Sequence, residues 1–255
     1  MIILIKKHVN RDRARVIKVK LIKTGRLPAS YCGADVKLSV EGAFQIVEDM
    51  VTEIMGDQHI DGVTCMREYG GMWVFVRNRI EMPQRLDWME EYTATSYISS
   101  FSKIRLYIDT VIQKSDGSIA VKSRLELCAV DLETGKIRRS ESVGVGENTP
   151  PEEPVFEIAY SKEKPVKCEL LDEFTVRSSD IDYCHHTNNI SYVRYFMNQI
   201  GVDDLIERPV KAIEVQYAAQ THEGDKLSVY RCSSESEAYM IEADGTKAVS
   251  CIINR

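Results

Sequence analysis

Long apolar runs and paired cysteines are both missing from this sequence of 255 residues. No stretch approaches the roughly 20 apolar residues that a membrane-spanning helix needs. The apolar residues 1–5 are too few for the core of a signal peptide, and Lys6 and Lys7 follow them rather than precede them. The sequence therefore predicts a cytoplasmic protein that does not bind a membrane.

Seven cysteines are scattered through the chain, and none belongs to a Cys-x-x-Cys pair. An odd number without such pairs argues against a disulfide framework and against a structural zinc site. We therefore expect most of them to be small buried apolar residues. They are Cys32, Cys65, Cys128, Cys168, Cys184, Cys232 and Cys251.

Acidic residues outnumber basic ones, and the formal net charge is −6. The balance is uneven, because residues 1–26 hold nine Lys or Arg against Asp12 alone. Residues 27–255 are left with 24 basic and 38 acidic groups, or −14. A body of that charge is a poor general binder of nucleic acid. We interpret the basic segment as an extra strand or a loose extension, with an arm for an acidic partner as the alternative.

A helix followed by strands is predicted twice. Apolar residues recur at helical spacing over residues 38–55, where Ser39 is placed to cap the helix. The same spacing covers residues 188–200, where Gly201 is placed to end the helix. β-Branched and aromatic residues, often in alternation, predict strands after each helix. These strands cover residues 72–79, 91–98, 103–113 and 119–131 in the first half, and 212–218, 226–232, 238–242 and 246–254 in the second.

Between the two halves, residues 141–165 carry four prolines and several glutamates, which is typical of a linker. A long helix beside an antiparallel sheet is an α+β arrangement in which the sheet can wrap the helix. Two copies in one chain imply a pair related by a pseudo-two-fold axis. We expect a basic extension over residues 1–27, a first repeat over 28–142, a linker over 143–166 and a second repeat over 167–255.

Polar side chains crowd into residues 180–192, which read Asp-Ile-Asp-Tyr-Cys-His-His-Thr-Asn-Asn-Ile-Ser-Tyr and lead into the second helix. Such a turn can present side chains and the unpaired N–H groups of a helix start to one point. The stretch resembles the D-x-D-x-N-x-H-x-N-N-x-x-Y motif of the acyl-acyl-carrier-protein (acyl-ACP) thioesterases of plants and bacteria. Weaker similarity in the order of elements extends over residues 30–255. That family's fold is the tandem hot dog, two long helices each wrapped by an antiparallel sheet, which fits the repeat.

The resemblance implies hydrolysis of a fatty acyl thioester on acyl carrier protein, in fatty acid biosynthesis and without a metal or organic cofactor. Asp182 and His186 match the aspartate and the histidine of the motif, and Asn188, Asn189 and Tyr192 also match. We expect Asp182 and His186 to handle the attacking water, because histidine has a near-neutral pKa. We expect the helix start at Asn188 and Asn189 to bind the substrate and its developing oxyanion.

Two of the four catalytic positions implied by the resemblance are changed. Cys184 stands where the family usually has asparagine, and Gln220 where it usually has glutamate. The change to Cys184 has three interpretations. The site has lost the hydrogen bonds of the asparagine, its side chains are supported differently, or Cys184 is a new nucleophile paired with His186. Gln220 can still bind water but cannot take a proton. A zinc site that adds His185 and His222 is a further alternative, although the spacing matches no common zinc motif.

The first half lacks a comparable cluster, because Asp35-Val36-Lys37-Leu38 contains no histidine, so we expect one site per chain. Met72 and Trp73 are expected to line an apolar acyl tunnel, with plain core packing as the alternative. Acyl carrier proteins are acidic, so their docking needs a local basic patch. The candidates for this patch are Arg77, Arg79 and Arg85, or Lys136, Arg138 and Arg139.

Two other functions are compatible with the sequence. One is an acyl-CoA thioesterase of the same fold. The other is a non-catalytic acyl-binding protein, which the changes at Cys184 and Gln220 favour. A homodimer also stays open, because tandem hot dogs can be self-sufficient or can pair further.

Overall fold

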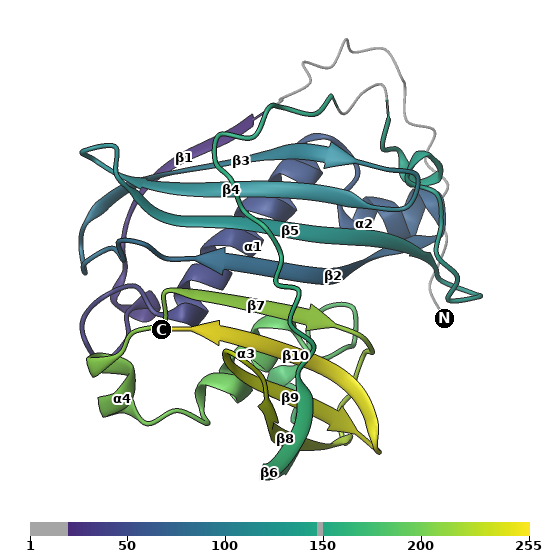
Figure 1. Ribbon diagram of the computed structural model, residues 1–255. Helices are drawn as coiled ribbons and strands as arrows, with labels where there is room; N and C mark the ends of the chain where they lie inside the picture. The colour runs from purple at the N-terminus through teal and green to yellow at the C-terminus, as the bar shows by residue number, and fades with distance from the viewer. Residues whose placement is uncertain (1–19, 147–149) are drawn as a thin grey trace.

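Two helices lie on one side of a ten-stranded antiparallel sheet in the computed structural model of the chain, which describes residues 20–146 and 150–255 (Figure 1). Helix α1 (Val40–Asp57) lies against the strands of the first half, and α3 (Asn189–Met197) against those of the second. The two helices contact each other, and their buried faces share one apolar core. The sheet therefore wraps both helices.

The strands of the two repeats follow the same order from the centre of the sheet outward. The first repeat reads β2 (Gly71–Glu81), β5 (Ile119–Asp131), β4 (Leu106–Lys114), β3 (Glu91–Phe101) and β1 (Lys20–Arg26). The second reads β7 (Ala212–Tyr217), β10 (Thr246–Asn254), β9 (Glu237–Ala243), β8 (Lys226–Ser233) and β6 (Val166–Thr175). At the centre β2 pairs with β7, where Ile80 lies opposite Ile213. This duplicated order is that of a tandem hot dog, and the predicted α+β fold class is confirmed.

Helix α1 begins where the sequence predicted. Ser39 is its N-cap, and the Ser39 hydroxyl accepts a hydrogen bond from the Gly42 N–H at 2.9 Å. Phe44 and Val47 lie on the same face and are fully buried. Only glycine fits at position 42, because a Cβ there would lie 2.4 Å from the carbonyl oxygen of Tyr31.

The outermost strand of each repeat lies across a predicted boundary. Strand β1 lies within residues 1–27, so the expected extension is too long and the first repeat begins no later than Lys20. The interpretation as an extra strand is therefore confirmed for Lys20–Arg26, whereas residues 1–19 lie outside the described residues. Strand β6 begins at Val166, the last residue of the predicted linker. Both are edge strands with mostly exposed side chains, and such strands commonly carry charged residues instead of a clean alternation.

The second helix is shorter than predicted. It ends at Met197, and Gly201 is the N-cap of a further helix, α4 (Val202–Glu207). Gly201 has a φ of −64°, which is not the left-handed conformation of a glycine that ends a helix. The short elements are α2 (Gly62–Thr64), the π-helical turn η2 (Cys65–Tyr69), and the 3-10 turns η1 (Ala29–Tyr31), η3 (Ser140–Val143) and η4 (Ser178–Asp180). Within the described ranges, no helix is both long and apolar enough to cross a membrane.

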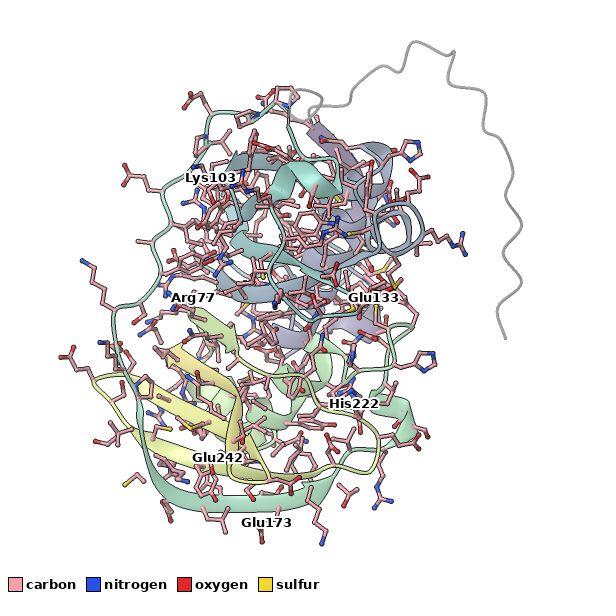
Figure 2. The ribbon with its side chains drawn as sticks, turned by 90° about the vertical axis from the view of Figure 1, so that its right-hand side faces the viewer. Arg77, Lys103, Glu133, Glu173, His222 and Glu242 are labelled. Atoms are coloured by element: carbon pink, nitrogen blue, oxygen red, sulfur yellow. The ribbon has the colours of Figure 1, made fainter. Side chains whose placement is uncertain are left out.

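The predicted linker crosses the outer face of the sheet, opposite the two helices (Figure 1). The Ser161 N–H of this linker donates a hydrogen bond of 2.7 Å to the carboxylate of Glu214 on β7. Glu214 is 4% exposed and also lies 3.6 Å from Arg77 and 3.5 Å from Arg79 on β2. Figure 2 shows Arg77 where the two repeats meet. These two arginines therefore neutralise a buried carboxylate at the centre of the sheet.

Candidate active site

The segment of residues 180–192 forms a tight turn that leads into α3. An isolated bridge joins Ile181 to Thr187 at the base of the turn. The Asp182 N–H donates to the carbonyl oxygen of His186 at 2.9 Å, and the His185 N–H donates to that of Asp182 at 3.0 Å. His185 has a φ of 64°, and its side chain is exposed. The turn therefore holds Asp182 and His186 opposite each other at the start of the helix.

The first repeat contains the same turn without the same side chains. The Gly33 N–H donates to the carbonyl oxygen of Lys37 at 2.8 Å, and the Val36 N–H donates to that of Gly33 at 3.0 Å. Val36 has the matching left-handed φ of 61°. Lys37 stands where the second repeat has His186, and Gly33 stands where it has Asp182. The backbone geometry of the turn is duplicated, but the aspartate and the histidine stand in the turn of the second repeat and not in that of the first.

Asn188 caps α3. Its side-chain oxygen accepts a hydrogen bond of 2.8 Å from the Ile190 N–H, and its own N–H donates to the carbonyl oxygen of Asp180 at 2.7 Å. The side-chain oxygen of Asn188 and the Ile190 N–H are thus already paired with each other. Asn189 is the first residue of the helix, and its side chain lowers the pKa of Glu48 on α1.

The imidazole ring of His186 lies beside that of His222, with ring centroids 5.0 Å apart and an angle of 66° between the planes. Burial first, and the neighbouring His222 second, lower the pKa of His186 below 6.5, while the charge of Asp182 acts in the opposite direction. His186 is therefore neutral at pH 7 and able to accept a hydrogen bond or a proton. His222 was predicted only as an alternative zinc ligand, and it lies in the part of the molecule formed by the second repeat (Figure 2).

Cys184 is held by the turn rather than paired with the histidine. Its N–H donates a hydrogen bond of 2.8 Å to the Asp182 carboxylate. Burial, and then the charge of Asp182, raise the pKa of the Cys184 thiol above its usual value. In the described part of the chain, no hydrogen bond joins its sulfur to His186. A protonated thiol without a base is a poor nucleophile, so the geometry disfavours a Cys–His pair.

Gln220 is exposed in the segment between β7 and β8. No hydrogen bond among the described residues links its side chain to the candidate turn. The next residue, Thr221, is fully buried, and its hydroxyl oxygen lies 2.7 Å from that of Thr187 and 2.6 Å from that of Tyr192. This hydroxyl network fixes the segment that carries Gln220 against the turn and the helix.

A carboxylate from the first repeat also reaches this site, and the sequence did not predict it. The side chain of Asn189 lies close enough to Glu48 on α1 to lower the pKa of its carboxyl. Its Oε1 is enclosed without a hydrogen-bond partner, although part of the side chain is exposed. Burial first, and then the charges of Asp49 and Asp182, raise the pKa of Glu48 to about 8. The hydroxyl of Tyr217 on β7 is likewise enclosed without a partner, and the charge of Glu48 helps to raise its pKa.

Met72 and Trp73 lie at the start of β2 and are partly buried. The indole N–H of Trp73 donates a hydrogen bond of 2.6 Å to the carbonyl oxygen of Ile60, and the ring packs against the core. Two residues further on, Gly62 lies so close to Tyr183 of the candidate turn that a Cβ would be 3.0 Å from the tyrosine hydroxyl. Trp73 is thus connected through residues 60–62 to the turn. Its role in lining an acyl tunnel stays a prediction.

A cavity of about 460 Å³ lies at the matching turn of the first repeat. Asp35 and Arg85 line it and form an ion pair of 2.8 Å, and Met82 and Met197 add apolar surface. Arg85 is therefore engaged inside the protein, like Arg77 and Arg79. Across residues 20–146 and 150–255, no group of three or more His, Cys, Asp and Glu side chains is arranged to hold a metal ion.

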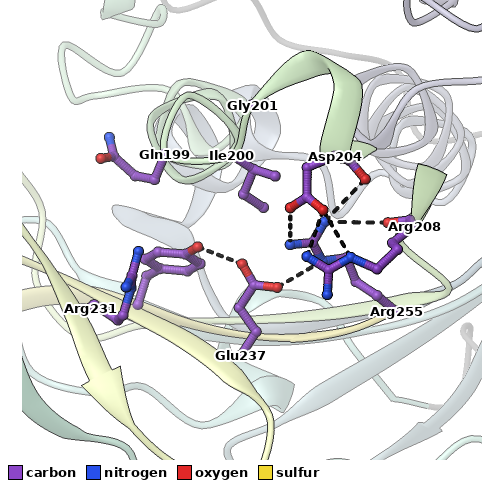
Figure 3. Close-up of a pocket in the computed structure, with 9 residues that line it drawn as sticks. Gln199, Ile200, Gly201, Asp204, Arg208, Arg231, Glu237 and Arg255 are labelled. Atoms are coloured by element: carbon purple, nitrogen blue, oxygen red, sulfur yellow. Dashed lines mark hydrogen bonds and ion pairs between the residues drawn. The ribbon is translucent and has the colours of Figure 1, made fainter. Parts of the chain in front are cut away.

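A second hollow, of about 330 Å³, lies beside α4 and is lined by charged side chains (Figure 3). Arg255 lies 2.6 Å from the carboxylate of Asp204 and 2.7 Å from that of Glu237. Arg208 pairs with the same Asp204 at 2.5 Å. These charged side chains are paired with one another. The ion pair between Arg255 and Asp204 therefore joins Arg255 to α4.

The fold and the turn together resemble thioesterases. The structure is similar to that of an acyl-ACP thioesterase from Bacteroides thetaiotaomicron, with a TM-score of 0.83 and 17% sequence identity over 92% of this chain and 96% of that chain. It is also similar to the 12:0-ACP thioesterase from Umbellularia californica, with a TM-score of 0.76 and 14% identity over 94% of this chain and 98% of that chain. At such identities the likeness shows the fold alone. No curated protein matches this sequence.

Residues 163–253 match the family model of the acyl-ACP thioesterase C-terminal domain. This match covers the second repeat, including the turn and α3. The resemblance inferred from residues 180–192 is thereby confirmed: the second repeat matches the model of the acyl-ACP thioesterase C-terminal domain, and the whole chain has the tandem hot-dog fold.

Proposed function

We propose that this protein is an acyl-ACP thioesterase, which hydrolyses a fatty acyl thioester to a free fatty acid and holo-ACP. The observation that carries the proposal is the turn at the start of α3, where Asp182 and a neutral His186 lie opposite each other. The turn belongs to the segment that matches the family's C-terminal domain. A water molecule can accept and donate hydrogen bonds at such a pair.

In the proposed reaction, Asp182 and His186 hold the attacking water beside the thioester carbonyl. The Ile190 N–H is occupied by the Asn188 cap. We therefore assign the neighbouring Asn189 N–H, at the positive end of α3, as a donor to the developing oxyanion. Gln220 can orient water but cannot accept its proton, so the base of the reaction has to be another group.

The choice of acyl carrier protein over coenzyme A depends on a basic docking surface. Arg77, Arg79 and Arg85 are engaged with buried or half-buried carboxylates, which argues against the first predicted patch. Lys136 and Arg139 near the end of β5 are exposed, which supports the second. Mutation of such exposed charges typically changes association rates and their salt dependence.

Steady-state hydrolysis of acyl-ACP and acyl-CoA substrates of several chain lengths, measured as released thiol, tests the proposal. The variant His186→Ala is expected to lower turnover by at least about tenfold, the usual size of a general acid–base or water-binding contribution. The matched control is His185→Asn, because asparagine tolerates the left-handed backbone of this exposed neighbour. Wild-type turnover in His186→Ala would remove His186 from the mechanism, and faster turnover of acyl-CoA would change the assigned carrier.

A non-catalytic acyl-binding protein is the second candidate function. It is favoured by the exposed Gln220 and by the raised pKa of the Cys184 thiol, since neither residue supplies a base or a nucleophile. Tight binding of an acyl-ACP without any release of thiol would establish this second function and exclude the first.

A further inference from the structure

The candidate site lies between the repeats, and one of its polar groups is left unsatisfied by the protein. Glu48 lies midway along α1, and α1 contacts α3. Its Oε1 is enclosed without a hydrogen-bond partner. Buried polar atoms are almost always paired in folded proteins, so an enclosed carboxylate oxygen without a partner indicates a place for a water molecule or a polar ligand atom.

Three other elements present polar groups to this carboxylate. The side chain of Asn189, at the start of α3, lowers the pKa of this carboxyl and so favours its charged form. Asp182 in the turn acts on it through its charge, and so does Asp49 on α1 itself. The hydroxyl of Tyr217 on β7 faces the same region and is also enclosed without a partner. Two enclosed oxygens without partners, on side chains that interact through charge, thus mark a polar position at the edge of the core beside the turn.

The pseudo-two-fold repeat supplies an independent comparison. Glu48 follows the helix cap Ser39 by nine residues, and Met197 follows the helix cap Asn188 by nine residues. Met197 lines the cavity at the first-repeat turn, next to Asp35. Each turn is thus faced by the same position of the opposite helix. The turn with the histidine is faced by a carboxylate, and the turn without a histidine is faced by a thioether.

We propose that Glu48, on the helix of the first repeat, is a catalytic residue of the site in the second repeat, where it takes the proton of the attacking water that Gln220 cannot take. This inference rests on the proposed hydrolysis of an acyl thioester.

The step balances without any further reactant. The Glu48 carboxylate removes a proton from water while the water oxygen bonds to the thioester carbon, which gives a tetrahedral oxyanion. The oxyanion collapses as the carbon–sulfur bond breaks, and the proton on Glu48 passes to the leaving sulfur. The products are the free acid and the carrier thiol, and Glu48 returns to its ionised form.

A base of this kind imposes a pH dependence. With a pKa of about 8, only about a tenth of Glu48 is ionised at pH 7. Burial first, and then Asp49 and Asp182, disfavour the charge of Glu48, whereas the side chain of Asn189 favours it. Turnover is therefore expected to rise roughly tenfold between pH 6 and pH 7 and to level off above about pH 8.

The experiment measures kcat and KM for acyl-ACP from pH 5.5 to 9.5 in wild type, Glu48→Gln and Glu48→Asp. The control is Glu53→Gln, a carboxylate on the exposed side of the same helix, paired with Lys23. Glu48→Gln is expected to lower kcat at least about 100-fold, with little change in KM, and to abolish the rise with pH. Glu48→Asp keeps the carboxylate and is expected to retain part of the rate and the rise.

The possible failures are distinguishable. A wild type that turns over acyl-ACP, together with a Glu48→Gln variant of the same kcat and pH profile, overturns the role of Glu48 and leaves the proposed function in place. A loss of kcat in Glu48→Gln with an unchanged pH profile also overturns the role as a base. A wild type that hydrolyses neither acyl-ACP nor acyl-CoA overturns the proposed function and the role of Glu48 with it.

Discussion

The buried carboxylate of Glu48 predicts an unusual effect on stability, which is independent of turnover. Its pKa is about 8 in the folded protein and 4.5 when solvated. Well below pH 4.5 the carboxyl group is neutral in the folded and the unfolded protein, so it does not lower the free energy of unfolding. As the pH rises from 4.5 to 8 the unfolded chain loses this proton before the folded protein does, so folding stability falls. The full loss corresponds to about 5 kcal/mol at 1.36 kcal/mol for each pH unit.

Glu48→Gln removes the charge and nearly keeps the shape. At pH 5 it is expected to have almost the wild-type free energy of unfolding, because Glu48 is then mostly neutral in the folded protein. At pH 9 it is expected to be more stable than wild type by about 3 to 5 kcal/mol, or roughly 10 °C in melting temperature for a chain of this size. A variant that loses activity and gains stability would be typical of a functional residue.

Urea unfolding at pH 5 and pH 9, followed by circular dichroism, measures this difference. Subtracting the wild-type change from the variant change cancels the other titrating groups. Glu53→Gln, which removes an exposed ion pair with Lys23, is expected to change stability by less than about 1 kcal/mol and equally at both values of pH. Equal stability of Glu48→Gln and wild type at pH 9 would refute the burial of this charge.

Three further predictions follow from the same contacts. Gln220→Glu is expected to leave kcat near the wild-type value, because the exposed side chain is not the base; a large gain in thiol release would assign that role to position 220. Thr221→Val should lower the free energy of unfolding by about 2 kcal/mol in urea titrations, since it breaks the buried hydroxyl network, and an unchanged midpoint would contradict this. Arg255→Ala should lower the free energy of unfolding by about 1 kcal/mol in the same assay, because Asp204 and Glu237 lose a partner but stay partly exposed. The loss should be smaller in high salt, and a loss that does not depend on salt would indicate a packing effect instead.

The periodic elements were predictable because their side chains alternate between core and solvent. The apolar spacing of α1 and the cap at Ser39 determine where that helix begins, and the Asp244-Gly245 turn separates β9 from β10. The edge strand β6 and the bounds of β1 were not predictable, since few of their residues are buried. The end of α3 was predicted wrongly because a glycine can either end a helix or precede the next one. In the structure Gly201 is the N-cap of α4.

The turn of the candidate site was predictable from its motif, but the contribution of the first repeat was not. Glu48 contacts Asn189, which is 141 residues away in the chain, and local periodicity carries no information about such a contact. One signal was present. Glu48 lies four residues after Phe44 and three before Val51, both fully buried, so a carboxylate interrupts the apolar face of α1. Such an interruption marks a candidate functional position.

Hydrolysis of the acyl thioester transfers the oxygen of water to the product acid, and this transfer can be measured. Acyl-ACP is incubated with the protein in water enriched in oxygen-18, and the released acid is analysed by mass spectrometry. We expect one heavy oxygen in each fatty acid and one free carrier thiol for each acid released. Protein-bound acyl-ACP that yields neither free acid nor thiol would contradict it.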